Sequence, residues 1–287
     1  MKKIIKYVLM LFAGFLVFLT GQTAAETIAV KRKINNFKQL GVYQEEISND
    51  NVKYYKVSRE TLGFEEVFKH DPFYGENNYT NPGSEGDIFV TRQSPFPFYP
   101  GIHQFISFYF GGHAAYLDDN NRVYEVAGIP DLEEGETFLD VFLKGNDSTT
   151  VYSTGNYWFD DDRRDEDDDS YSYYGSYYRK EWVGLRVKGV SQEEVKLVTA
   201  EMQRLEEMEA QYNFQFIFNR KDRYYCTDLM SRAYETIINN NSLKKVNLNR
   251  DGVAVTVNDL ILSKDVYLAY YVWTDKNDVK HVYFIDD

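Results

Sequence analysis

The chain has 287 residues, of which 43% are hydrophobic and 17% aromatic, and its formal net charge is −13. This composition is typical of a folded globular protein and excludes a disordered chain. The negative charge also argues against a surface built to bind nucleic acid or anionic lipid, because both carry charge of the same sign.

Residues 1–25 have the layout of a secretory signal peptide. Three lysines within residues 2–6 precede an apolar run over 7–19, and small residues follow at 23–25. The apolar run is shorter than the ~20 residues that a membrane span needs. We therefore expect a cleaved signal and a secreted or cell-envelope protein, with an uncleaved N-terminal anchor as the alternative. Cleavage would remove three lysines and no acidic residue, which changes the net charge from −13 to −16.

Residues 26–83 read as an N-terminal extension of unclear structure, with a short helix expected around 58–69. The turn-rich sequence NPGSEGD then leads into a strand that starts at Ile88. We expect a hydrolase domain over residues 84–287. Within it, the apolar segment 104–110 is compatible with either a strand or a helical turn.

The sequence GGHAAYLDDNNRVYEV, residues 111–126, predicts a β-hairpin, because its Asp and Asn residues accept turn geometry. With the loop centred on Asp119, His113 lies directly opposite Glu125. Side chains alternate faces along a strand, so this pair shares an otherwise apolar face. A carboxylate opposite an imidazole orients the ring and favours its protonated form. Gly111 and Gly112 would leave room beside the ring for substrate or for a packed helix. A hydrogen-bonded core histidine is the alternative interpretation.

Residues 144–181 read as an insertion, because they contain a run of acidic residues followed by a tyrosine-rich stretch. A strand over 183–189 follows. Ser191, with Glu194 three residues later, predicts a capped helix that ends near residue 211. A second helix begins near Cys226, and two strands over 266–274 and 279–285 close the chain as a hairpin.

Cys226 is the one cysteine of the chain, so an internal disulfide cannot form. Its predicted place at the start of a helix supplies free N–H groups and the positive end of the helix dipole, which stabilise a thiolate. A cysteine, a histidine and a third polar group form the nucleophile, base and orienting group of a cysteine hydrolase. The candidate catalytic residues are therefore Cys226, His113 and Glu125. A buried structural cysteine is the alternative.

Three segments carry a family resemblance: EGDIFVTR (85–92), GHAAYLDDNNRVYEVAG (112–128) and YNFQFIFNRKDRYYCTDLMSRAY (212–234). They resemble the motif regions of the permuted papain-like amidases and cysteine peptidases of the NlpC-type superfamily, in its YiiX-like branch. The histidine strand precedes the cysteine helix, as in the circularly permuted members. The resemblance covers about residues 84–240.

The resemblance implies a role for each matching residue. Cys226 matches the nucleophile, His113 the base, and Glu125 the third polar residue. Asp87 matches the aspartate of the Gly-Asp-Ile start, which we expect to be structural. Thr227 departs from the serine that often follows the cysteine, a mild change.

The fold expected from these observations is α+β, with a small antiparallel sheet packed against the Cys226 helix. The expected function is that of an exported cysteine hydrolase that cleaves an amide bond, most simply in cell-wall peptide, through an acyl-enzyme and without a cofactor. Alternatives are a lipid acyl hydrolase or acyltransferase, a non-catalytic binding module, and a zinc site formed by the same three residues. We expect no nucleic-acid partner and at most a weak association with the cell envelope. The oligomeric state is not predicted.

Overall fold

The structure is a computed structural model that describes residues 2–62, 73, 81–93, 101–128, 149–160, 179–213, 216, 221–241, 245–249 and 254–285. The acidic and tyrosine-rich part of the predicted insertion, residues 161–178, lies outside these described residues, as does most of the predicted helix over 58–69.

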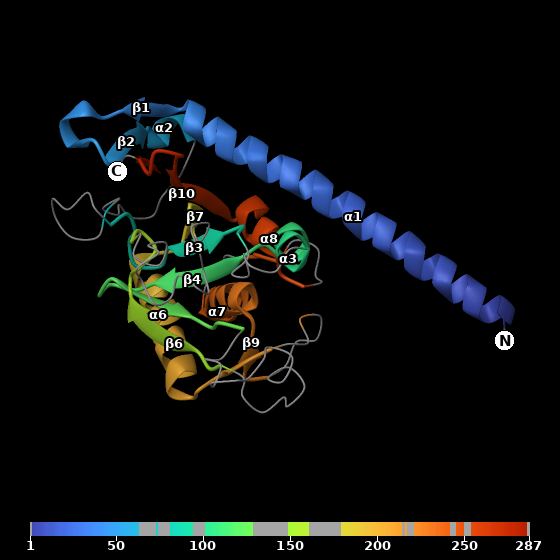
Figure 1. The fold of residues 1–287 in the computed structure, drawn as a ribbon. Coiled ribbons are helices and arrows are strands. Elements are labelled where there is room, and N and C mark those ends of the chain that lie inside the picture. Colours follow the sequence, from blue (N-terminus) through green and yellow to red (C-terminus); the bar gives the residue numbers. More distant parts are fainter. Residues whose placement is uncertain are drawn as a thin grey trace, which may run out of the picture.

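Within the described residues, nine strands form one large sheet (Figure 1). The strands are β1 (Gly41–Tyr43), β2 (Val52–Val57), β3 (Ile88–Thr91), β4 (His113–Leu117), β5 (Arg122–Glu125), β6 (Tyr152–Gly155), β7 (Glu181–Val187), β10 (Val266–Thr274) and β11 (Lys280–Ile285). Their order is β1-β2-β11-β10-β7-β3-β4-β5-β6. Neighbours are antiparallel, except that β2 and β11 run parallel. The short strands β8 (Gln211–Tyr212) and β9 (Arg223–Tyr224) pair in a second, parallel sheet.

The α+β class is confirmed, but the sheet is larger than predicted and is mixed. The closing hairpin forms as expected, and its strand β10 pairs with β7. Strand β2, from the predicted N-terminal extension, then adds to the free edge of β11. The edge of a strand presents backbone N–H and C=O groups that form hydrogen bonds when a second strand pairs with it. The extension therefore becomes part of the sheet.

The helices are α1 (Lys2–Gln39), α2 (Arg59–Leu62), α3 (Ile102–Tyr109), α6 (Gln192–Glu207), α7 (Cys226–Asn241) and α8 (Val257–Leu262), with a 3-10 turn η1 (Glu45–Ile47). The capping box predicted at Ser191 is confirmed, because its side chain accepts from the Glu194 N–H while Glu194 bonds back. Helix α7 packs on β4 and on α6. The undecided segment 104–110 is helical, in α3.

A buried ion pair joins β7 to Asp87, the residue directly before β3. The Arg186 guanidinium, on β7, donates from Nε to Asp87 Oδ1 at 2.8 Å and from Nη2 to Asp87 Oδ2 at 3.0 Å. Nη2 also donates to the hydroxyl of Tyr270, on β10, at 2.7 Å. All three residues are buried. A two-point contact of this kind fixes register, which fits the structural role expected for Asp87.

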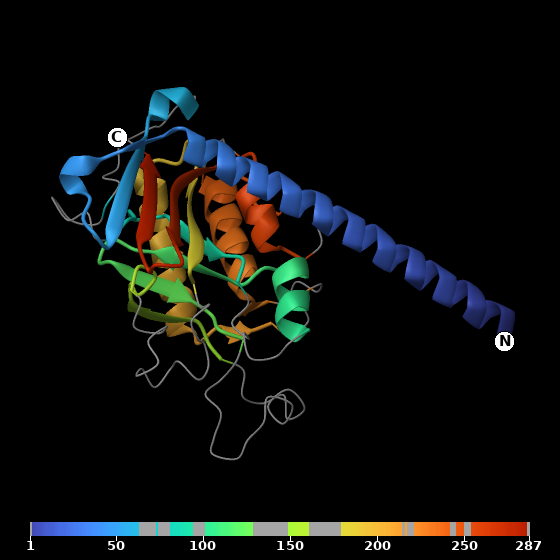
Figure 2. The same ribbon diagram turned by 45° about the horizontal axis from the view of Figure 1, so that its top comes forward.

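Helix α1 is long and has two different halves (Figures 1 and 2). Its N-terminal half projects away from the body, whereas Val30, Ile34 and Phe37 in the other half are buried. Helix α1 contacts α3, α8 and β10. Among the described residues, α1 is the one helix that is long and apolar enough to cross a membrane.

Candidate active site

Two glycines position the start of β4, and therefore His113. Gly111 has a φ of +86°, a conformation that favours glycine, and a Cβ there would lie 2.5 Å from the Cβ of Val257. A Cβ on Gly112 would overlap the backbone carbonyl of Gln93. The sequence suggested that these glycines leave room for substrate or for the cysteine helix. They instead allow close contact with α8 and with the end of β3.

The hairpin forms, but its register differs from the predicted one by two residues. Tyr116 pairs with Tyr124 and Leu117 with Val123, so the loop is centred on Asn120 rather than Asp119. The turn is set by Asp118, whose Oδ1 accepts from the backbone N–H groups of Asn120 and Arg122. His113 and Glu125 are therefore diagonal rather than directly opposite. A shift of two residues keeps both side chains on the same face.

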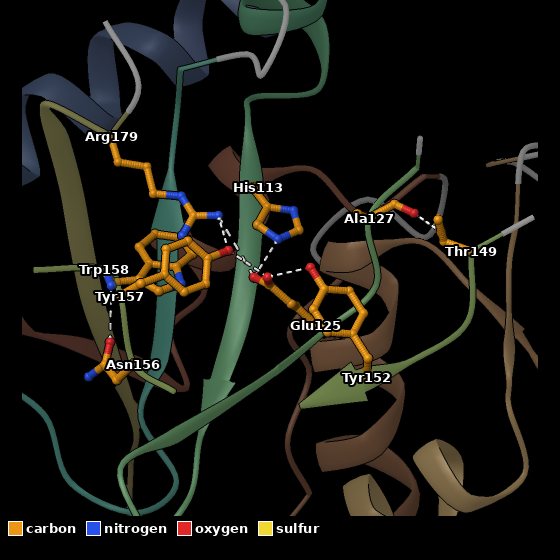
Figure 3. Close-up of polar contacts among 9 residues, drawn as sticks. All are labelled: His113, Glu125, Ala127, Thr149, Tyr152, Asn156, Tyr157, Trp158 and Arg179. Carbon is orange, nitrogen blue, oxygen red and sulfur yellow. Dashed lines mark hydrogen bonds and ion pairs between the residues drawn. The ribbon is translucent and has the colours of Figure 1, made fainter. Parts of the chain in front are cut away.

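His113 and Glu125 are in direct contact on that face. His113 Nε2 lies 2.8 Å from Glu125 Oε2 (Figure 3). The His113 side chain is 13% exposed and that of Glu125 is 1% exposed. The His113 ring is nearly parallel to that of Trp158, at an interplanar angle of 10° and a centroid distance of 6.2 Å. The carboxylate is therefore buried, and the imidazole keeps a small exposed surface.

The second oxygen of Glu125 is held by two tyrosines. Tyr152 and Tyr157 donate their hydroxyls to Oε1 at 2.6 and 2.5 Å. Arg179 donates from Nη2 to the Tyr157 hydroxyl at 2.8 Å, and the same atom lies 3.8 Å from Glu125 Oε2. Figure 3 shows its guanidinium beside Tyr157 and Trp158, 4.0 Å from the Trp158 ring centroid. Hydrogen bonds and positive charge thus keep Glu125 ionised.

The pKa values of His113 and Glu125 shift in opposite directions. Burial lowers the pKa of His113, but the charge of Glu125, the nearby Cys226 side chain and the hydrogen bond that the ring donates to Glu125 outweigh it and raise the pKa to about 9. Burial raises the pKa of Glu125, but the charge and hydrogen bond of His113, helped by Arg179 and Tyr152, lower it to about 2. At neutral pH the pair is therefore an imidazolium and a carboxylate.

Cys226 is the first residue of α7 and is partly buried. Its side chain lies close enough to His113 to help raise the pKa of the imidazole. Since Nε2 of the ring bonds Glu125, the nitrogen left for the thiol is Nδ1. The first N–H groups of a helix have no partner within it, so the start of α7 offers backbone donors near the sulfur. The structure therefore brings together all three candidate residues, Cys226, His113 and Glu125.

The arrangement does not favour the zinc alternative. Within the described residues, no group of three or more His, Cys, Asp or Glu side chains could hold a metal ion. His113 Nε2 and the Glu125 carboxylate are bonded to each other, so they do not face a shared metal position. A metal site needs its donor atoms to converge on one point, which these do not.

Sequence reasoning missed Tyr152, Tyr157 and Arg179. They fall within the segment 144–181, which was interpreted as an insertion, yet β6 pairs with β5 and brings these residues against Glu125. The predicted insertion is therefore built into the site at both of its ends. The available signal was the aromatic residues at 152, 157 and 158, just ahead of the acidic run.

Comparison with known proteins returns no matching family model, no matching curated protein and no matching solved structure. Fold and site together define an α+β protein in which a buried Glu–His pair contacts a cysteine at a helix start.

Proposed function

We propose that this chain is an exported cysteine hydrolase that cleaves an amide bond, with cell-wall peptide as substrate. The observation that carries the proposal is the His113 ring, which bonds the Glu125 carboxylate through Nε2 and lies beside the Cys226 side chain at the start of α7. A nucleophile, a base and an orienting group in this order are the working parts of acyl-transfer enzymes.

The first half-reaction forms an acyl-enzyme. The Cys226 sulfur, held as a thiolate beside protonated His113, attacks the amide carbonyl carbon. The carbon–nitrogen bond then breaks, and His113 gives its Nδ1 proton to the leaving amine. Glu125 keeps the ring in place throughout, because its carboxylate accepts the Nε2–H. General acid catalysis of this kind contributes roughly 10²–10⁴-fold.

The second half-reaction releases the product. His113, now neutral, takes a proton from water, and the resulting hydroxide attacks the thioester. The carbon–sulfur bond breaks, which frees the carboxylic acid and restores the thiolate and the imidazolium. The backbone N–H of Cys226, at the start of α7, is the donor we assign to the oxyanion in both steps.

The permuted papain-like fold belongs to the same proposal. Three features support it: the histidine strand precedes the cysteine helix in the chain, α7 packs on β4, and a polar side chain of the neighbouring strand orients the histidine. Strand β2 and helix α1 are additions to that pattern.

A second candidate function is the hydrolysis of an acyl lipid by the same three residues. The observation that favours it is a series of aromatic contacts from the surface toward Cys226. Phe110 is 37% exposed and lies 5.5 Å, between ring centroids, from Phe216, which lies 5.2 Å from Tyr225. Tyr225 directly precedes Cys226, so this aromatic series connects the surface at Phe110 with the residue next to the proposed nucleophile.

Mass spectrometry of products separates the two candidates. The purified protein is incubated separately with cell-wall fragments and with a lipid extract, and Cys226→Ser is the matched control. The proposal predicts new amine and carboxylate ends in the peptide fragments with the wild-type protein alone. Fatty acids released from lipid would support the second candidate, and no difference between wild type and Cys226→Ser in either substrate would overturn both.

A further inference from the structure

The N-terminal half of α1 carries a continuous apolar surface that the body does not cover. No charged residue lies between Lys6 and Glu26. At 1.5 Å per residue this stretch is about 28 Å long, close to the ~30 Å of a bilayer core. Its large apolar side chains are exposed, including Leu9, Met10, Leu11, Phe12, Phe15, Leu16, Val17 and Phe18.

The predicted cleavage region, residues 23–25, lies inside packed helix. Thr23 is 8% exposed. Before it, the Thr20 hydroxyl bonds the Tyr109 hydroxyl of α3 at 2.7 Å, and after it, Thr27 accepts from Arg92 at 3.4 Å. The helix therefore continues through this region and is attached to the body on both sides of it.

The far end of α1 is fixed to the body more firmly still. Lys33 donates from Nζ to the Ile261 carbonyl of α8 at 2.6 Å. The Lys38 ammonium lies 4.9 Å from the ring centroid of Trp273 and 5.1 Å from that of Tyr271. A helix held in this way transmits the orientation of its apolar half to the whole domain.

Helix α3 lies beside α1 where the apolar half meets the body (Figure 2). It contains no Asp, Glu, Lys or Arg, although the chain as a whole is acidic. Phe105 is 56% exposed, and its ring contacts those of Tyr109 and Phe110 at centroid distances of 4.8 and 6.3 Å. Aromatic side chains of this kind are enriched at the membrane–water boundary.

We propose that α1 is a retained membrane anchor and that α3 lies in the outer interface of the same bilayer. Thr20, which binds α3, precedes the end of the uncharged stretch by five residues. At 1.5 Å per residue, α3 therefore contacts α1 about 7 Å from that end, toward the bilayer centre. Interfacial helices lie at this depth. The lysines at residues 2–6 orient the N-terminus toward the cytoplasm, so the domain is outside. Because β4 starts four residues after α3, His113 is held close to the bilayer surface. The inference does not depend on catalysis.

The test uses the full chain, expressed in bacteria and reconstituted into phosphatidylcholine nanodiscs with brominated acyl chains. Intact mass of the purified protein should include residues 1–25. Phe105→Trp should add fluorescence that bromine quenches, after subtraction of the wild-type signal. Leu197→Trp is the matched control, because Leu197 is 45% exposed on α6, away from the projecting half of α1 (Figures 1 and 2). Its added fluorescence should be quenched several-fold less. A chain that begins at Glu26, or equal quenching of the two variants, would overturn the proposal.

Discussion

The charge state of one histidine depends on a single carboxylate. Glu125 bonds His113 Nε2 with one oxygen and accepts two tyrosine hydroxyls with the other. A buried carboxylate with fewer partners would take up a proton, because burial disfavours its charge. Tyr152, Tyr157 and Arg179 therefore act on His113 through Glu125.

Replacing Glu125 with Gln should lower the pKa of His113 from about 9. The amide oxygen can still accept the tyrosines, but the amide N–H₂ then faces Nε2. Neutral His113 must accept at Nε2 and carry its proton on Nδ1, which removes the base from Cys226. We expect activity to fall by roughly 10³–10⁴-fold, as for other triads with the wrong tautomer. Steady-state kinetics and NMR titration of the histidines measure the two effects.

The double variant Glu125→Gln with His113→Ala is the control for that prediction. It should be little slower than His113→Ala alone, since Glu125 has nothing to orient once the ring is gone. If the two losses multiplied fully, Glu125 would act independently of His113, and its role as orienting group would be wrong.

At the scale of elements, the hairpin shows what the sequence could and could not predict. The shared face of His113 and Glu125 was predicted correctly, because the predicted and observed registers differ by an even number of residues, which leaves both side chains on the same face. The register itself depends on the loop, where the Asp118 side chain accepts two backbone N–H groups. Four consecutive turn-forming residues offered two centres one residue apart, which differ by two residues in register, and composition does not choose between them.

Gly112→Ala should destabilise the fold strongly, because the added Cβ would meet the Gln93 carbonyl, which is backbone and cannot turn away. Strand β4 would have to shift at its first residue, His113. We expect a loss of ~2–4 kcal/mol, a fall in Tm of roughly 5–15 °C. Thermal unfolding followed by circular dichroism measures it.

Gly155→Ala, on β6, is the matched control, because a Cβ there meets nothing within 4 Å. Its Tm should stay within about 2 °C of the wild-type value. An unchanged Tm for Gly112→Ala would contradict the packing described for the start of β4.

At the scale of the whole molecule, the α+β class and the proximity of Cys226, His113 and Glu125 were predictable, but the extent of the sheet was not. Strand β2 and strand β6 come from segments that composition marked as an extension and an insertion. Pairing between strands distant in sequence leaves no local signal, since the partner supplies half of the hydrogen bonds. Likewise, the sequence sets residues 1–25 apart from the fold, whereas they form one continuous helix with residues 26–39, in which Val30, Ile34 and Phe37 are buried.

The His113–Glu125 pair should also make the stability of the protein depend on pH. The pKa of His113 is raised to about 9, so its contribution is complete below its ordinary value near 6.5 and is lost as pH rises through 9. The pKa of Glu125 is lowered to about 2, so its contribution is complete above about 4.5 and is lost toward pH 2.

The free energy of unfolding of the wild type should therefore exceed that of Glu125→Gln most between about pH 4.5 and 6.5. Urea unfolding at pH 5.5 and 9.5 measures the difference. Burial raises the pKa of Asp228 to about 6. This group is present in both proteins, so its effect on the difference between their free energies of unfolding largely cancels. A difference that is equal or larger at pH 9.5 would contradict the assigned charges.

The most direct test of the catalytic centre is the rate at which iodoacetamide alkylates the protein, followed by intact mass from pH 5 to 10. Cys226 is the one cysteine, so each added group reports on it alone. If His113 and Cys226 form an ion pair, the wild type should be alkylated rapidly at pH 6, where an ordinary thiol is almost fully protonated. The rate for His113→Ala should be at least ~10-fold lower. Alkylation that rises only near pH 8.5, and equally in both proteins, would contradict a His113–Cys226 ion pair.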